Sequence, residues 1–133
     1  MRDINQIIVH CTATPRGRDF TVADIDRWHR ARGFACIGYH YVVYLDGSIH
    51  PGRDVGRAGA HCRGHNAYSI GVVYVGGVEA DGSPADTRTP EQRAALSVLI
   101  KRLKGLYPGV TVHSHYEFAA KACPCFDAAA EYS

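Results

Sequence analysis

Runs of apolar residues alternate with amphipathic stretches along this chain, and their order predicts a β-sheet with helices packed against it. Residues 7–11 form a short β-branched run that ends in the polar segment 12–18, as expected of a buried strand that leads into a functional loop. Residues 69–75 form the most apolar run and show no alternation, which is typical of a central strand. Residues 39–44 predict a further strand, which a hairpin turn at Asp46-Gly47 follows.

Two segments carry the periodicity and the end signals of helices. The first begins with Thr21 as its N-cap and ends at Gly33. The second begins at Thr89, where a proline and a glutamine complete a well-formed helix start, and it ends before Pro108. Residues 110–115 then alternate as a last strand. The order strand, helix, strands, helix, strand predicts an α/β fold with a central mixed β-sheet flanked by helices.

Length and composition are those of one domain. The 133 residues fit a single domain spanning 1–133, and apolar residues make up 46% of them, which is ordinary for a globular protein. The formal net charge of +2 is too small to indicate nucleic acid as a ligand. No stretch approaches the ~20 apolar residues that span a bilayer, so we expect no membrane insertion. The N-terminus lacks the pattern of a signal peptide, so we expect the protein to be made in the cytoplasm. We also expect it to be a monomer.

Two histidines stand at the ends of predicted strands, where open α/β sheets gather their ligands. His10 lies at the end of the first strand, His115 ends the last strand, and Cys123 follows it in the chain. Two imidazoles and a thiolate from separate strand ends would form a three-ligand zinc site with the fourth position open to water. His113 projects to the same face as His115 in an alternating strand, so His113 is an alternative ligand.

The chain has five cysteines. They stand at positions 11, 36, 62, 123 and 125, and an odd number cannot all pair within the chain. We expect Cys11 and Cys36 to be small buried apolar residues. Cys123 and Cys125 flank a proline late in the chain.

Three segments, which follow one another in order along the chain, carry recognisable motifs: IIVHCTATP, IGYHYVVYLDGSIHPGRDVGRAGAHCRGHNAYSIGVVYVGG and HSHYEFAAKACPCFD. Together they resemble the zinc N-acetylmuramoyl-L-alanine amidases of the lysozyme from T-odd coliphages, a group that belongs with the peptidoglycan recognition proteins in one superfamily. The resemblance implies that fold. It also implies zinc-dependent hydrolysis of the amide bond between N-acetylmuramic acid and L-alanine in peptidoglycan, by an enzyme that acts on the cell wall after its release.

The resemblance also implies roles for individual residues. The zinc ligands of the family correspond to His10, His115 and Cys123. Its catalytic pair corresponds to Tyr39 in the Gly-Tyr-His motif and Lys121 in the Lys-x-Cys-Pro motif. Recognition proteins that have lost amidase activity typically lack the cysteine, and this sequence keeps it. The resemblance therefore favours an enzyme over a non-catalytic peptidoglycan-binding module.

Other positions in these motifs are candidates for substrate binding or for structural roles. His61 resembles a groove position that touches the glycan–peptide substrate. Asn66 either does likewise or forms a turn. Arg57 either pairs with a stem-peptide carboxylate or is solvated, and His40 is expected to be a structural hydrogen-bonding histidine beneath the site. Cys125 departs from the phage pattern, which has serine there, so competition for the metal and disulfide formation both stay open.

A Cys–His peptidase is a second alternative, with Cys123 as its nucleophile. Pro124 disfavours it, because a proline directly after the nucleophile removes a backbone N–H that would help to stabilise a thiolate or an oxyanion. The sequence also lacks an evident pair of carboxylates for glycoside hydrolysis.

Overall fold

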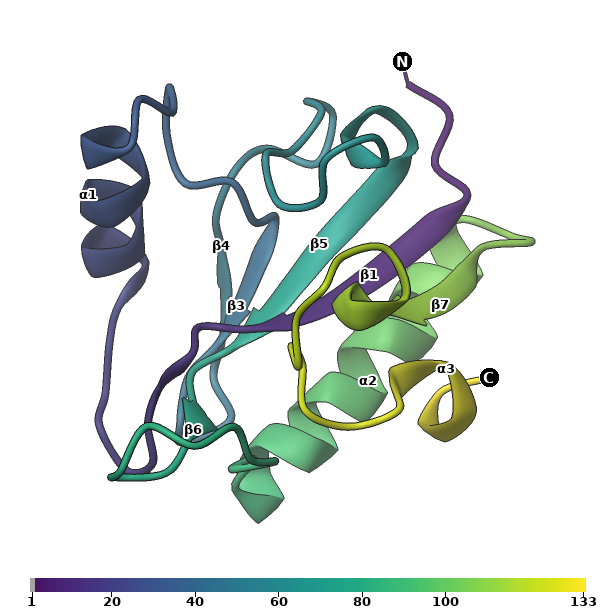
Figure 1. Cartoon of the computed structure of the whole chain (residues 1–133). Coiled ribbons are helices and arrows are strands. Elements are labelled where there is room, and N and C mark those ends of the chain that lie inside the picture. The colour runs from purple at the N-terminus through teal and green to yellow at the C-terminus, as the bar shows by residue number, and fades with distance from the viewer. Residues whose placement is uncertain (1) are drawn as a thin grey trace.

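The structure, a computed structural model, describes residues 2–133 and is built on a five-stranded sheet ordered β4-β3-β5-β1-β7 (Figure 1). The strands are β1 (Gln6–Cys11), β3 (Tyr41–Val43), β4 (Ile49–Pro51), β5 (Ser69–Tyr74) and β7 (Thr111–Ser114). β1 is parallel to β5 and β7, β3 is parallel to β5, and β4 is antiparallel to β3. The predicted mixed sheet and the central place of its most apolar strand are confirmed.

Helices cover both faces of this sheet (Figure 1). The long helix α2 (Pro90–Leu106) packs its leucines against one face, and the short helix α3 (Ala128–Glu131) joins the same core. Helix α1 (Val22–Ala31) covers the other face through Ile25, which shares a second core with residues of β3 and β5. The predicted α/β layering is therefore observed.

The alternation of side chains along β1 decides which face carries the chemistry. Ile7, Val9 and Cys11 belong to the core beneath α2. His10 lies between two of them in sequence and therefore points to the opposite face. It is in register with Val73 of β5, which belongs to the core beneath α1. The candidate site thus lies on the face that α1 shares.

Both long helices begin as the sequence predicts. Thr21 and Thr89 each form a capping box, with Asp24 and Gln92 as the respective partners. The side-chain amide of Gln92 is also buried and donates a hydrogen bond to the carbonyl oxygen of Val75, 2.9 Å away. The cap of α2 therefore also ties that helix to the chain beyond the central strand.

The last strand is shorter than the alternation predicts. It ends at Ser114, and His115 begins a 3-10 turn, η2 (His115–Glu117). Ser114 and Glu117 form a capping box, in which the Ser114 N–H donates to Glu117 Oε2 at 2.7 Å. Turn formation at this cap stops the alternation, so His113 and His115 do not share one strand face.

Smaller elements complete the chain. A two-stranded sheet pairs β2 (Thr14–Pro15) with β6 (Gly77–Val78), and η1 (Asn66–Tyr68) ends the long Gly-, Arg- and His-rich loop. Cys11 is buried as expected, whereas Cys36, expected to be buried, is partly exposed because it lies in a loop between α1 and β3. None of the helices within residues 2–133 has the length and apolar character needed to cross a bilayer.

A buried arginine fixes the C-terminal segment on the rest of the domain. The Arg88 side chain is 1% exposed, and its guanidinium donates hydrogen bonds to the carboxylates of Asp86 and Glu131. The same guanidinium lies 3.4 Å from the centroid of the Phe126 ring. Charge-assisted hydrogen bonds of this kind are stronger than neutral ones, so α3 is held by ion pairs as well as by packing.

We expect Glu131→Gln to lower stability and to weaken its dependence on acid pH. The hydrogen bond from Arg88 holds the pKa of Glu131 below its ordinary value of 4.5. Because the folded-state pKa is depressed, this stabilisation is present above the unfolded-state pKa and is lost as the pH falls through the folded-state pKa. At pH 7 the free energy of unfolding of the variant should be about 1 kcal/mol lower than that of the wild type. On acidification the free energy of unfolding should fall less in the variant than in the wild type. Urea unfolding across this pH range checks it, with the exposed Glu91→Gln as control; equal acid sensitivity of Glu131→Gln and wild type would contradict the prediction.

Candidate metal centre

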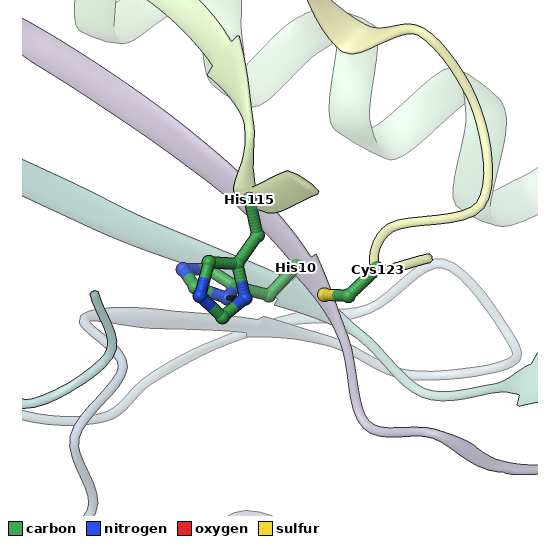
Figure 2. A group of neighbouring side chains, drawn as sticks. All are labelled: His10, His115 and Cys123. Carbon is green, nitrogen blue, oxygen red and sulfur yellow. Dashed lines mark hydrogen bonds between the residues drawn. The ribbon is translucent and has the colours of Figure 1, made fainter. Parts of the chain in front are cut away.

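Three side chains predicted to bind a metal meet at the carboxyl ends of β1 and β7 (Figure 2). The Nδ1 atoms of His10 and His115 are 3.1 Å apart, and with the Cys123 sulfur all the ligand atoms lie within 4.8 Å of one another. His10 is 1% exposed and His115 is 9% exposed. Figure 2 shows the two imidazoles close together, with the Cys123 sulfur pointing toward them from the loop after η2. The structure therefore brings these three residues together.

Strand register places the two histidines. Val9 of β1 pairs with Ser114 of β7, and His10 and His115 each follow by one residue. Parallel strands end at the same edge of a sheet, so both side chains emerge there. Cys123 arrives from the C-terminal loop, where its sulfur accepts a hydrogen bond from the Cys11 backbone N–H at 3.1 Å.

The surroundings favour the ligand forms that a metal needs. Burial lowers the pKa of His10 well below its ordinary value, and the nearby His61 and His115 rings add to this. Burial also lowers the pKa of His115, with a contribution from Lys121. Hydrogen bonding from the Cys11 side chain, and from its backbone N–H, lowers the pKa of Cys123 although burial opposes it. Two neutral imidazoles and a stabilised thiolate form a donor set that fits zinc.

His113, the alternative ligand, is engaged elsewhere. Its Nε2 lies 2.7 Å from Thr111 Oγ1 and its Nδ1 lies 2.9 Å from Glu117 Oε1. Because the strand ends at Ser114, the chain turns before His115 and separates the two imidazoles. The structure brings His115, and not His113, to the candidate centre.

Tyr39 and Lys121, the predicted catalytic pair, both lie near the centre. The Tyr39 ring centroid is 5.1 Å from that of His10. Burial raises the pKa of Tyr39 above its ordinary value, so its phenol stays protonated at neutral pH. Lys121 is exposed and lines the same cavity as His115.

A cavity of about 550 Å³ opens beside His115. The residues that line it are Arg32, Phe34, Ala60, His61, Cys62, Arg63, Asn66, His115, Phe118, Ala119 and Lys121. Three of these residues, Arg32, Arg63 and Lys121, are basic, and none is acidic. The cavity therefore favours an anionic ligand.

The three predicted substrate-binding residues have different surroundings. His61 lines the cavity, and its Nδ1 lies 2.8 Å from His10 Nε2. Asn66 also lines the cavity, and its Oδ1 accepts hydrogen bonds from the backbone N–H groups of His61 and Cys62, as a turn-forming asparagine does. Arg57 is not among the lining residues.

His40 makes the hydrogen bonds expected of a structural histidine. The Gly71 N–H donates to His40 Nδ1 at 3.0 Å, so Nε2 carries the proton and donates to the Arg57 carbonyl oxygen at 2.8 Å. Arg2 holds the same region, since its guanidinium donates to the Val55 and Ser69 carbonyl oxygens. Neither the Arg2 contacts nor their partners are predictable from the sequence.

His29 supports the centre but was not predicted to do so. Its Nδ1 accepts a hydrogen bond from the Gly38 N–H at 2.8 Å, and its ring centroid lies 5.3 Å from that of Tyr39. His29 therefore helps to hold the segment that carries Tyr39. Its spacing of four residues from Ile25 on a predicted helix was the available signal that it faces the core.

The fold and the site together define an α/β protein in which two histidines and a cysteine that could hold a metal ion lie next to an open cavity. The chain belongs to the N-acetylmuramoyl-L-alanine amidase family, whose sequence model matches residues 1–126. The endolysin of Enterobacteria phage K11 is 40% identical over 126 residues, which cover 95% of this chain and 83% of the endolysin.

Solved structures show the same fold. The N-acetylmuramoyl-L-alanine amidase LysC from Clostridium intestinale superposes with a TM-score of 0.82 at 28% identity, covering 98% of this chain and 82% of LysC. A Drosophila PGRP-LB variant in complex with tracheal cytotoxin superposes with a TM-score of 0.80 at 25% identity, covering 98% of this chain and 80% of that protein. The fold implied by the sequence motifs is thereby confirmed.

We expect the protein to bind one divalent metal ion through His10, His115 and Cys123. His115→Ala should remove most of the bound metal, because it leaves only two ligands. His113→Ala is the matched control and should retain the metal, since its ring contacts Thr111 and Glu117 instead. Metal content after dialysis, measured by plasma mass spectrometry, checks this; metal loss in His113→Ala but not in His115→Ala would show that the ligands are assigned wrongly.

Proposed function

We propose that the protein is a zinc-dependent amidase that hydrolyses the bond between N-acetylmuramic acid and L-alanine in peptidoglycan. The observation that carries this proposal is the convergence of His10, His115 and Cys123 beside an open cavity. Membership of the amidase family and similarity to a phage endolysin support the reaction class. We also propose that it acts as a monomer on the cell wall after its release.

Zinc suits both the donors and the reaction. Two neutral imidazoles and one thiolate give a zinc site a net charge near +1 and leave a fourth position free. Bound zinc would supply Lewis acidity, which polarises the scissile carbonyl and lowers the pKa of the attacking water toward ~7. This chemistry matters because an amide is a poor electrophile and water is a poor nucleophile at neutral pH.

Lys121 is the candidate for stabilising negative charge. Its side chain lies at the cavity beside His115, where the scissile carbonyl would have to be bound. Attack on that carbonyl turns its oxygen negative, and an ammonium group nearby stabilises the developing charge more than it stabilises the neutral substrate. Lys121 therefore contributes to the chemical step more than to substrate binding.

Tyr39 is the candidate for handling a proton. Its ring lies close to that of His10, and its phenol, which stays protonated at neutral pH, is able to donate a hydrogen bond. From this position it would orient the attacking water or pass a proton to the leaving nitrogen of L-alanine.

The cavity suits a peptide that carries carboxylates. Arg32, Arg63 and Lys121 give it positive charge, and stem peptides of peptidoglycan end in carboxylates. His61 and Asn66 lie where they would contact such a peptide. The pairing of Arg57 with a stem-peptide carboxylate stays a prediction.

The bond cleaved can be identified from the products. Digestion of purified peptidoglycan should free L-alanine amino termini and leave glycan strands intact, and a chelator should abolish this release. Mass spectrometry of the soluble fraction with and without chelator measures both. New reducing sugar ends as the main product would indicate a glycosidase. Retention of wall without peptide release would indicate a binding module, and chelator-resistant cleavage that thiol alkylation blocks would indicate a Cys–His peptidase.

We expect Lys121→Ala to lower kcat by about a hundredfold or more, because one stabilising donor of the transition state is lost. Zinc content and KM should change much less. Steady-state kinetics on a soluble muropeptide, together with metal analysis, measures these quantities. Lys101→Ala, which removes an exposed lysine from α2, is the matched control. Loss of zinc, or a raised KM with kcat intact, would assign Lys121 to structure or to substrate docking.

A further inference from the structure

The imidazole of His61 contacts His10 and packs against two glycines, Gly59 and Gly71. A Cβ added at either Gly59 or Gly71 would lie 2.6 Å from the Cδ2 atom of His61, a distance that real Cβ atoms essentially never show. Gly59 belongs to the long loop and Gly71 to the central strand β5. The ring therefore fills space that is free because Gly59 and Gly71 have no side chains.

Backbone conformation does not explain these glycines. Neither Gly59 nor Gly71 is among the glycines with a positive φ, so a residue with a side chain would meet no conformational barrier there. A glycine inside a strand normally weakens the strand, since it packs nothing and is flexible when unfolded. The closest contacts of a Cβ at Gly71 would all be with the His61 ring, whereas a Cβ at Gly59 would also lie 2.8 Å from the Gly38 carbonyl oxygen and 2.9 Å from His40 Cε1. The space occupied by the His61 ring is the feature that both positions share.

The hydrogen bonds around the ring form a consistent series. His10 Nδ1 lies 3.1 Å from His115 Nδ1 at the candidate centre, so with this nitrogen bound to the metal the proton of a neutral His10 is on Nε2. That Nε2 lies 2.8 Å from Nδ1 of His61, which must then be the acceptor. The proton of His61 is left on Nε2, which lies 3.2 Å from Ser69 Oγ and donates to it.

The main chain of His61 is held as firmly as its ring. Asn66 Oδ1 accepts hydrogen bonds from the N–H groups of His61 and Cys62, at 2.9 and 3.0 Å. The N–H of the preceding Ala60 donates to the Gly38 carbonyl oxygen at 3.1 Å. Asn66 thus serves the centre through His61, which accounts for the turn geometry that it adopts.

We propose that His61 is a positioning residue: it accepts the Nε2 proton of His10 and so fixes the tautomer and the ring orientation that present Nδ1 to the metal. Metal-bound histidines commonly donate their second ring nitrogen to such an acceptor, and loss of the acceptor weakens metal binding. The inference rests on the proposed zinc site and gives His61 a role that does not require contact with substrate.

Zinc affinity tests this role without reference to turnover. Competition with a chromophoric chelator should show about 10–100-fold weaker zinc binding in His61→Ala. His61→Asn should recover most of the affinity, because its Oδ1 can occupy the place of Nδ1 and accept the same proton. His65→Ala is the matched control from the same loop; its ring contacts Gln6 and Phe118, and its removal should leave the affinity unchanged.

Two further measurements separate positioning from general stability. Long-range proton–nitrogen NMR spectra of the zinc-loaded wild type should show His61 protonated on Nε2 and unprotonated on Nδ1. Gly71→Ala should weaken zinc binding while the imidazole is still present, because the new methyl group displaces the ring. Thermal unfolding of the metal-free variants identifies any variant that loses the fold, and zinc affinity is compared only among folded proteins. If His61→Ala does not fold, the zinc affinity of His61→Asn is compared with that of the wild type.

The outcomes distinguish this inference from the proposed function. If the wild type binds no zinc, both fail. If the wild type binds zinc and a folded His61→Ala binds it equally well, only the positioning role is overturned. A proton on Nδ1 of His61 in the zinc-loaded protein, or a failure of His61→Asn to recover affinity, would likewise overturn it.

Discussion

The parallel register of β1 with β7 is the constraint on which the candidate centre depends. Because Val9 pairs with Ser114, the next residue of each strand, His10 and His115, emerges at the same edge of the sheet, and their Nδ1 atoms lie 3.1 Å apart. A shift of one residue would turn His10 into the core beneath α2. The burial of Ile7 and Val9 in that core therefore fixes the place of the first ligand.

Cys123, the third candidate ligand, reaches the centre from a loop outside the sheet, and residues of the sheet hold that loop in place. Ser114 Oγ donates a hydrogen bond to the Phe126 carbonyl oxygen, and the Tyr74 hydroxyl donates to the carbonyl oxygen of Pro124, the residue after Cys123. Tyr74 and Ser114 are fully buried. Strand β7, which precedes His115, and the central strand β5 thus hold the loop that carries Cys123.

Local signals in the sequence predicted much of this arrangement. His10 follows a β-branched run, so its place at a buried strand end was predictable. His115 was not separable from His113, because alternation treats them alike; the cap formed by Ser114 and Glu117 decides between them. The role of His61 depends on contacts across 51 residues and on space left by two glycines. The two glycines are visible in the sequence, but the sequence does not show which side chain fills the space beside them, so that role required the structure.

The C-terminal helix α3 lies beyond the end of the family match but inside the folded core. The family match ends at residue 126, yet Ala128 and Tyr132 are buried in the main core and Glu131 binds the guanidinium of Arg88. The family match therefore includes every residue of the candidate centre but leaves out residues that belong to the core. A protein truncated at residue 126, where the family match ends, would lose Ala128 and Tyr132 and with them part of the hydrophobic core.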